Sequence, residues 1–184
     1  ISAVQPDGII LTPPHSENRL ITALLEERGI PFARIGSIEP GPGIAMTMGD
    51  EGSARLATDF LAGLGHGRIG FIAGSQEYSL SSWRVDGWQQ LMRERGLATE
   101  GLCVEGDFTF EGGLAAAATL LDGDSPPTAI IAGNDQMALA VLQLAQERGL
   151  EIPGDLSIVS FDNTPVVRFT QPQLTAIDQP IAAT

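Results

Sequence analysis

The sequence contains no lysine. All 10 of its basic residues are arginine and 23 residues are acidic, which gives a formal net charge of −13 and a pI near 4.3. A segment with this excess of negative charge is repelled by a phosphate backbone and by an anionic membrane surface. The composition therefore argues against direct binding of nucleic acid or membranes by these 184 residues.

Cysteine and histidine are also scarce. Cys103 is the only cysteine, which excludes an intrachain disulfide and a thiolate metal cluster, and we expect it to be a small buried residue. His15 and His66 lack the spacing of a metal site, and the Gly65-His66-Gly67 sequence predicts a structural imidazole where a helix ends. The sequence therefore predicts neither a metal site nor a cofactor.

Long apolar runs and enzyme motifs are absent. No stretch approaches the ~18 apolar residues that span a bilayer, and the first residues lack the basic-then-apolar pattern of a secretory signal. There is no G-x-G-x-x-G after a strand, no P-loop, no G-x-S-x-G and no H-E-x-x-H, so no catalytic residue is predicted. We expect a cytoplasmic protein that is not an enzyme. Its start at Ile1 suggests a fragment.

Short apolar runs alternate with stretches of helical period, which predicts an α/β fold with a mostly parallel sheet covered on both faces. Strands are predicted at 8–11, 31–36, 69–73, 102–105, 128–132, 156–161 and 174–177, and helices at 20–28, 50–64, 84–95, 111–121 and 135–148. Trp88 stands on an apolar helix face and is predicted to lie in the core. The Pro/Gly-rich loop 40–43 is the predicted passage between two subdomains.

Polar side chains follow four of the predicted strands, at the edge of a parallel sheet where ligands bind. The main candidates are Gln76, Ser81, Ser82, Trp83, Arg84, Asp107, Phe108, Asn134, Asp135, Asp162 and Asn163. Arginine only donates hydrogen bonds, a carboxylate only accepts them and an amide does both, a combination that suits vicinal hydroxyl groups. Trp83 or Phe108 can stack on the C–H face of a sugar. The sequence therefore predicts a binding site for a polyhydroxylated ligand.

Three of these residues have structural alternatives. Asp135 fits the N-cap of the following helix, because aspartate is a favoured capping residue. Asn134 fits a turn. Arg84 can instead pair with Glu77 or Asp86 on the surface.

Four segments together resemble the LacI/GalR family of bacterial transcription regulators. They are spread over residues 50–180, in the order and at the spacing of the family: DEGSARLATDFLAGLGHGRIGFIAG (50–74), AGNDQMA (132–138), IPGDLSIVSFDN (152–163) and LTAIDQP (174–180). This match of several motifs in order is far more specific than any single motif.

The resemblance implies the effector-binding core of the family, with two α/β subdomains around a ligand cleft, similar to periplasmic sugar-binding proteins. It assigns 1–47 to the first subdomain, 48–178 to the second, and 179–184 to the return into the first. Family members carry a basic helix-turn-helix and a further β-α-β-α stretch before the position of Ile1, and they continue past Thr184. The resemblance thus implies a chain truncated at both ends, with an incomplete first subdomain.

The resemblance also implies a function. Arg84, Asn134 and Asp162 match ligand-binding positions of the family, and Phe108 matches an aromatic residue that often lines the pocket. The implied protein binds a small polyhydroxylated effector, a sugar or derivative, and thereby changes its affinity for operator DNA through a helix-turn-helix domain absent from this chain. A homodimer paired through 139–147 and 166–171 is expected. The alternatives are an exported solute-binding receptor of a sugar transport system and, less consistent with the motifs, an enzyme acting at the sheet edge.

Overall fold

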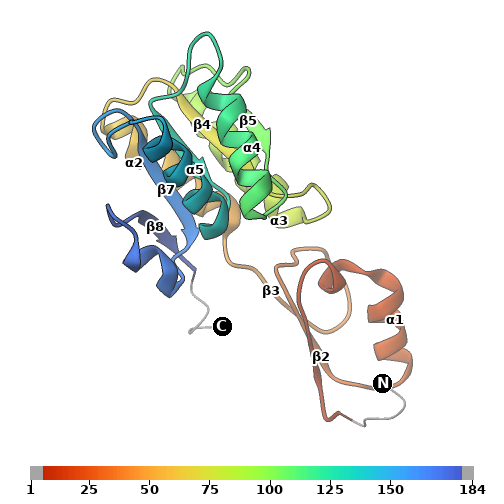
Figure 1. Ribbon diagram of the computed structural model, residues 1–184. Helices are drawn as coiled ribbons and strands as arrows, with labels where there is room; N and C mark the ends of the chain where they lie inside the picture. The colour runs from red at the N-terminus through yellow and green to blue at the C-terminus, as the bar shows by residue number, and fades with distance from the viewer. Residues whose placement is uncertain (1–5, 180–184) are drawn as a thin grey trace. The chain divides into compact units, whose positions relative to one another are not determined.

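The structure, a computed structural model, describes residues 6–179 (Figure 1). Strands alternate with helices along most of the described chain, except that β3 follows β2 directly. In order, the elements are β1 (Ile9–Leu11), the 3-10 helix η1 (His15–Glu17), α1 (Arg19–Glu27), β2 (Phe32–Ile35), β3 (Ile44–Met46), α2 (Asp50–Gly63), β4 (Ile69–Ala73), α3 (Ser79–Glu94), β5 (Cys103–Glu105), α4 (Phe110–Leu121), β6 (Ala129–Ala132), α5 (Asp135–Glu147), β7 (Ser157–Asp162), the 3-10 helix η2 (Pro165–Phe169) and β8 (Thr175–Asp178). The predicted α/β class is confirmed.

The described chain divides into two units. The smaller contains residues 6–49 and 77–80, and the larger contains 50–76 and 81–179. The first boundary falls between Gly49 and Asp50, so the loop 40–43 lies inside the smaller unit, and the prediction that it forms the passage between subdomains is wrong. The subdomain bounds 1–47, 48–178 and 179–184 stay a prediction, of which 1–5 and 180–184 lie outside the described residues.

The smaller unit holds a parallel sheet in the order β1-β2-β3. Asn18 caps α1 by accepting hydrogen bonds from the backbone N–H groups of the second and third helical residues. Leu11, Leu25 and Phe32 form the core of this unit. The helical spacing of Leu20 and Leu25 predicts that both are buried. Leu25 is buried together with Thr22, but Leu20 is 83% exposed.

The larger unit is built on a five-stranded parallel sheet in the order β5-β4-β6-β7-β8. Every residue of β4 and β6 is buried. This burial explains why both strands read as continuous apolar runs rather than as alternating patterns. The central strands β4 and β6 pair over four residues, from Ile69 beside Ala129 to Ile72 beside Ala132.

Helices cover both faces of this sheet, as predicted. Alternate strand residues point to opposite faces, so Ile130 and Ala132 meet α4 and α5, whereas Ala129 and Ile131 meet α2 and α3. Figure 1 shows α4 and α5 side by side over one face. Trp88 is fully buried on the other face, which confirms its predicted core position.

Two of the predicted helices differ from the observed ones. α3 begins at Ser79, five residues before the predicted start, because its first turn is rich in serine and carries no apolar period. The helical spacing of its apolar residues predicts that α2 buries Ala54, Ala57, Phe60, Leu61 and Leu64. Ala54, Ala57 and Leu61 are buried as predicted, but Phe60 and Leu64 are 50% and 63% exposed.

His66 has the structural role predicted for it. It lies at the amino end of the sheet, where Nδ1 is 2.8 Å from Oγ1 of Thr128 and Nε2 is 3.1 Å from Oγ of Ser157. Burial lowers the pKa of the imidazole, so the neutral form is favoured there. The imidazole thus links the turn after α2 to the starts of two strands.

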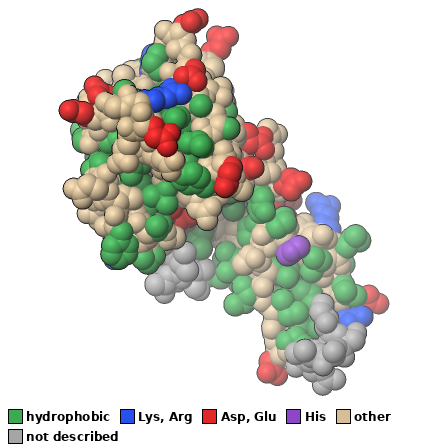
Figure 2. All heavy atoms as spheres, viewed as in Figure 1, with side chains coloured by type: hydrophobic (Ala, Val, Ile, Leu, Met, Phe, Trp, Pro, Cys, Tyr) green, Lys and Arg blue, Asp and Glu red, His purple; other side chains and the backbone are tan. Residues whose placement is uncertain are grey.

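The surface carries more negative than positive side chains. On the face drawn in Figure 2, acidic groups are scattered widely and the few arginines form no continuous patch. None of the helices in residues 6–179 has the length and apolar character that crossing a membrane requires.

Candidate functional site

The five parallel strands of the larger unit all point the same way, so their carboxyl ends lie together at one end of the sheet. The four predicted ligand-binding residues all lie on segments that leave this end. Phe108 follows β5, Asn134 follows β6, Asp162 ends β7, and Arg84 belongs to α3, the helix after β4. We call this group the rim. The structure brings the four residues together, and their role in ligand binding stays a prediction.

Arg84 is buried, and its guanidinium is held on three sides. Nε donates to Oδ1 of Asp50 at 2.8 Å, and Nη2 lies 2.8 Å from the same oxygen. Nη1 donates to the carbonyl oxygen of Gly133 at 2.5 Å. The face of the group lies 4.5 Å from the ring centroid of Phe161, a cation–π distance. The alternative of a surface pair with Glu77 or Asp86 is therefore wrong.

Asp50 and Phe161 are the site residues that sequence reasoning missed. Asp50 is the first residue of α2, where an aspartate is typical of a helix cap. It reaches Arg84 because α2 and α3 approach very closely: a Cβ added at Gly87 would lie 2.2 Å from the carbonyl oxygen of Glu51. No local pattern connects positions 50 and 84, so this pairing depends on tertiary structure.

Asn134 is the N-cap of α5. Its Oδ1 accepts from the backbone N–H of Met137 at 2.9 Å, and its Nδ2 donates to the carbonyl oxygen of Phe108 at 2.9 Å. The amide is therefore oriented by two bonds and retains one N–H for a further partner. The Phe108 ring lies directly against Gly74, where an added Cβ would be 1.8 Å from Cζ. A glycine at the end of β4 thus makes room for the aromatic side chain.

Asp135 does not have the capping role predicted for it. It is buried, and its carboxylate accepts from Oγ of Ser160 and, at 2.7 and 2.6 Å, from N and Oγ1 of Thr164. The cap itself is Asn134, so the alternative that treats Asn134 as a turn residue is also wrong. Asp135 instead fastens the loop after β7 to the start of α5.

Asp162 is the half-buried carboxylate of the rim. Within residues 6–179 no hydrogen bond engages its side chain. Burial raises the pKa of this carboxyl, the nearby Arg84 lowers it, and the Asp135 and Asp50 carboxylates raise it further. The Asp162 carboxylate can thus accept hydrogen bonds but receives none within the described residues. The nearby Arg84 is already paired with Asp50.

Backbone strain is concentrated at the rim. Four non-glycine residues of the described chain have a positive φ: Asp107 (53°), Phe108 (66°), Asp162 (93°) and Asn163 (55°). They lie at or directly after the carboxyl ends of β5 and β7, on the same side of the sheet as the rim. Non-glycine residues rarely adopt this conformation, and such strain clusters at functional sites.

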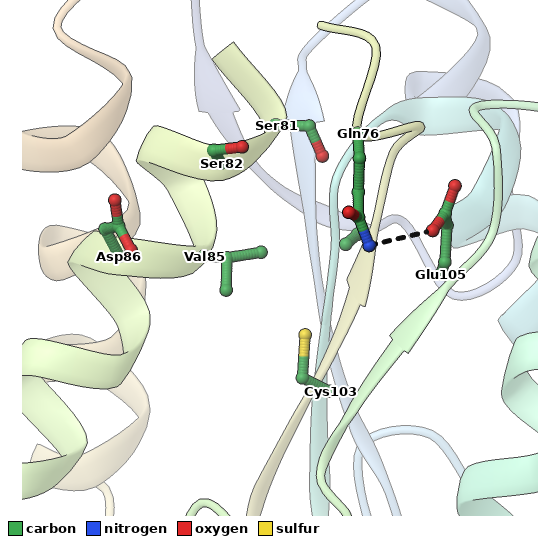
Figure 3. A pocket seen from close by; sticks show the side chains of 8 residues that line it. Gln76, Ser81, Ser82, Val85, Asp86, Cys103 and Glu105 are labelled. Atoms are coloured by element: carbon green, nitrogen blue, oxygen red, sulfur yellow. Dashed lines mark hydrogen bonds between the residues drawn. The ribbon is translucent and has the colours of Figure 1, made fainter. Parts of the chain in front are cut away.

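A hollow lies beside α3, next to the edge strand β5 of the same sheet. It has a volume of about 270 Å³, and Figure 3 shows the Cys103 thiol pointing into it, with Asp86 on the α3 side and Gln76 bonded to Glu105 at 3.3 Å on the other. None of the four rim residues lines it, but three other candidates from the sequence, Gln76, Ser81 and Ser82, do. Cys103 is only half-buried, contrary to prediction, and burial together with Glu105 raises the pKa of its thiol to about 11.

The thiol is therefore protonated at neutral pH and a poor nucleophile. Across residues 6–179, no three His, Cys, Asp or Glu side chains are grouped so that they could hold a metal ion.

Comparison with known proteins agrees with this geometry. Residues 58–184 match the family described as "Periplasmic binding protein-like domain". The chain is 37% identical over 185 residues to catabolite control protein A of Priestia megaterium, covering 96% of this chain and 54% of that protein. It is 44% identical over 125 residues to the transcriptional repressor CytR of Escherichia coli K12, covering 67% of this chain and 37% of the repressor. The chain spans about half the length, or less, of these curated relatives.

Solved structures show the same fold. A LacI-family regulatory protein from Chloroflexus aggregans superposes with a TM-score of 0.87 at 33% identity, covering 96% of this chain and 64% of that one. The transcriptional regulator CelR in complex with cellobiose superposes with a TM-score of 0.85 at 31% identity, covering 95% of this chain and 54% of that one. The chain therefore belongs to the periplasmic binding protein-like family, in the form of the effector-binding cores of LacI-family regulators.

Proposed function

We propose that this chain is the effector-sensing core of a cytoplasmic transcriptional regulator, and that it binds a small polyhydroxylated effector, a sugar or a sugar derivative, at the rim. Its relatives are named as transcriptional regulators, which favours this function over an enzyme and over a transport receptor of the same fold. A cellobiose complex among the structural neighbours supports a sugar as the effector class.

Asp162 is the observation that carries the proposal. A carboxylate that is half-buried, has no hydrogen-bond donor within residues 6–179 and is held by a strained backbone is costly unless it serves a partner. Sugar hydroxyl groups are donors that match it. The remaining N–H of Asn134 and the free N–H groups of Arg84 then supply donors for the sugar oxygens.

Effector binding and DNA binding are coupled through the conformation of the regulator. An effector can change DNA affinity only by as much as it binds one conformation of the regulator more tightly than another. We place the DNA-binding part outside residues 1–184, because the net charge of −13 opposes contact with phosphates.

We further propose that the protein is a homodimer paired through α5 and η2. η2 packs against α5 and exposes two large apolar side chains, Val166 at 44% and Phe169 at 86%. Exposed apolar groups this close together are typical of a protein interface. Leu139 on α5 is also half-buried.

A binding measurement tests the effector site. A panel of neutral saccharides and nucleosides would first be screened by thermal shift, and a stabilising compound would then be measured by calorimetry. Asp162→Asn should weaken its binding by roughly 10- to 150-fold, since a hydrogen bond to a charged group is worth about 1.5–3 kcal/mol. Asparagine tolerates a positive φ, so the backbone at this position should keep its conformation.

Asp124→Asn is the matched control, because Asp124 is exposed and lies on the loop before β6, at the opposite end of the sheet. It removes the same charge and should leave the affinity unchanged. Equal affinity of wild type and Asp162→Asn would refute the rim as the effector site.

A further inference from the structure

We propose that Asp50 determines the charge class of the effector: by neutralising Arg84, it makes the rim accept uncharged ligands and reject anionic ones such as phosphorylated sugars. This inference rests on the proposed function, because it concerns the ligand of the same site.

The Arg84–Asp50 pair is buried and closely bonded. The side chains are 6% and 2% exposed, and a single carboxylate oxygen, Oδ1, receives both Nε and Nη2 at 2.8 Å. With the bond from Nη1 to the Gly133 carbonyl, each of the three guanidinium nitrogens has an oxygen of the protein within 2.8 Å. The positive charge of Arg84 is therefore compensated by Asp50. The second N–H group of Nη1 and that of Nη2 are left for neutral acceptors.

The other charges around Arg84 are negative. Asp135 is a buried carboxylate bonded to Ser160 and Thr164, and the Asp162 carboxyl responds electrostatically to Arg84, Asp135 and Asp50. One guanidinium thus shares the rim of the described chain with three carboxyl groups. In a desolvated site this excess repels an anion strongly, because charge interactions there are poorly screened.

An anionic ligand would have to displace Asp50 to use the charge of Arg84. Displacement would leave a buried carboxylate without a counter-ion, which is strongly unfavourable. Hydroxyl groups need no such exchange, since each can accept from a free N–H of Arg84 and donate to the oxygens of Asp162. The geometry therefore favours neutral ligands over their phosphate esters.

Inorganic phosphate is a direct probe of this arrangement. The melting temperature of the wild-type chain should not respond to phosphate when compared with chloride at equal ionic strength. Asp50→Asn keeps an oxygen that can accept from Arg84 but removes the compensating charge, so phosphate should raise its melting temperature by several degrees. Glu51→Gln is the matched control: it removes a charge from the same helical turn at an exposed side chain and should behave like wild type.

Two results would overturn the role of Asp50: a phosphate-dependent rise in wild type equal to that of Asp50→Asn, or no rise in a folded Asp50→Asn. If the variant does not fold, the wild-type chain decides. It should bind a neutral saccharide at least 10-fold more tightly than the corresponding phosphate monoester, and equal or tighter binding of the ester contradicts the inference. If saccharides do not bind at all, the proposed function fails, while the phosphate comparison still tests Asp50.

Discussion

Asp162, the proposed effector-binding carboxylate, is held at a cost to the fold. Its carboxyl is half-buried, and the backbone there has a φ of 93°. Arg84 offsets part of the desolvation but is itself bonded to Asp50. Residues that break local rules in this way are expected where function requires them.

This cost predicts a pH-dependent effect on stability. The folded-state pKa of Asp162 is raised above its unfolded value of about 3.9, so the stability associated with its protonated form is present at low pH and is lost as the pH rises through the folded-state pKa. Asp162→Asn stays neutral at every pH. Its melting temperature relative to wild type should therefore be higher at pH 7 than at pH 4, as measured by circular dichroism. A relative melting temperature that does not fall with decreasing pH would contradict this account.

The strand order and the family resemblance located the rim residues from sequence, because parallel strands bring the segments after their carboxyl ends to one edge of the sheet. The partners of those residues could not be located in the same way. Asp50 meets Arg84, and Gly74 meets Phe108, through packing between segments 34 residues apart in both cases. Asp135 was misassigned as a cap because capping propensity is local, whereas its actual partners lie on and after β7.

At the scale of elements, the close approach of α2 and α3 builds the charged part of the site. Gly87 is buried in α3, and the backbone of Glu51 occupies the space where a side chain would lie. The contact positions the first residue of α2 next to Arg84. A glycine that weakens a helix is therefore explained by the packing that it permits.

Gly87→Ala should separate these helices. The added Cβ would lie 2.2 Å from a backbone oxygen that cannot move aside alone, and overpacking of this kind costs about 1–3 kcal/mol. Urea denaturation would measure the loss. Gly52→Ala is the control within α2, since no atom lies within 4 Å of its added Cβ, and it should gain roughly 0.5–1 kcal/mol from helix propensity. Equal effects of the two substitutions would argue against the close contact.

The elements themselves were predictable to different degrees. Buried strands such as β4 and β6 carry continuous apolar runs, so their positions followed from sequence. The start of α3 did not, because Ser79–Trp83 lack an apolar period and are helical through their contacts. The apolar period of α2 also predicts a wider buried face than the structure has, since Phe60 and Leu64 are exposed.

At the scale of the whole molecule, the proposed function makes this chain a sensor core that acts as part of a larger assembly. Exposed Phe169 and Val166 on η2 are the basis of the proposed dimer. The acidic composition argues against DNA contact by this part of the protein. The proposed function therefore gives sensing and pairing to these residues and DNA recognition to other parts of the protein.

Phe169→Glu should weaken the dimer. Burying a carboxylate in an apolar interface is unfavourable, so light scattering after size-exclusion chromatography should show a shift of at least 10-fold toward monomer. Leu56→Glu is the control, because Leu56 is 63% exposed on α2, away from the proposed interface. A wild-type chain that is monomeric at high concentration would contradict the dimer.

The most direct test of the central claim is an NMR titration of the ¹⁵N-labelled 19.3 kDa chain with a neutral saccharide or nucleoside that stabilises it. Binding at the rim predicts that the largest amide shift changes fall around Arg84, Phe108, Asn134 and Asp162. Changes centred instead on the hollow beside α3, around Ser82, Asp86 and Cys103, would show that the effector binds elsewhere.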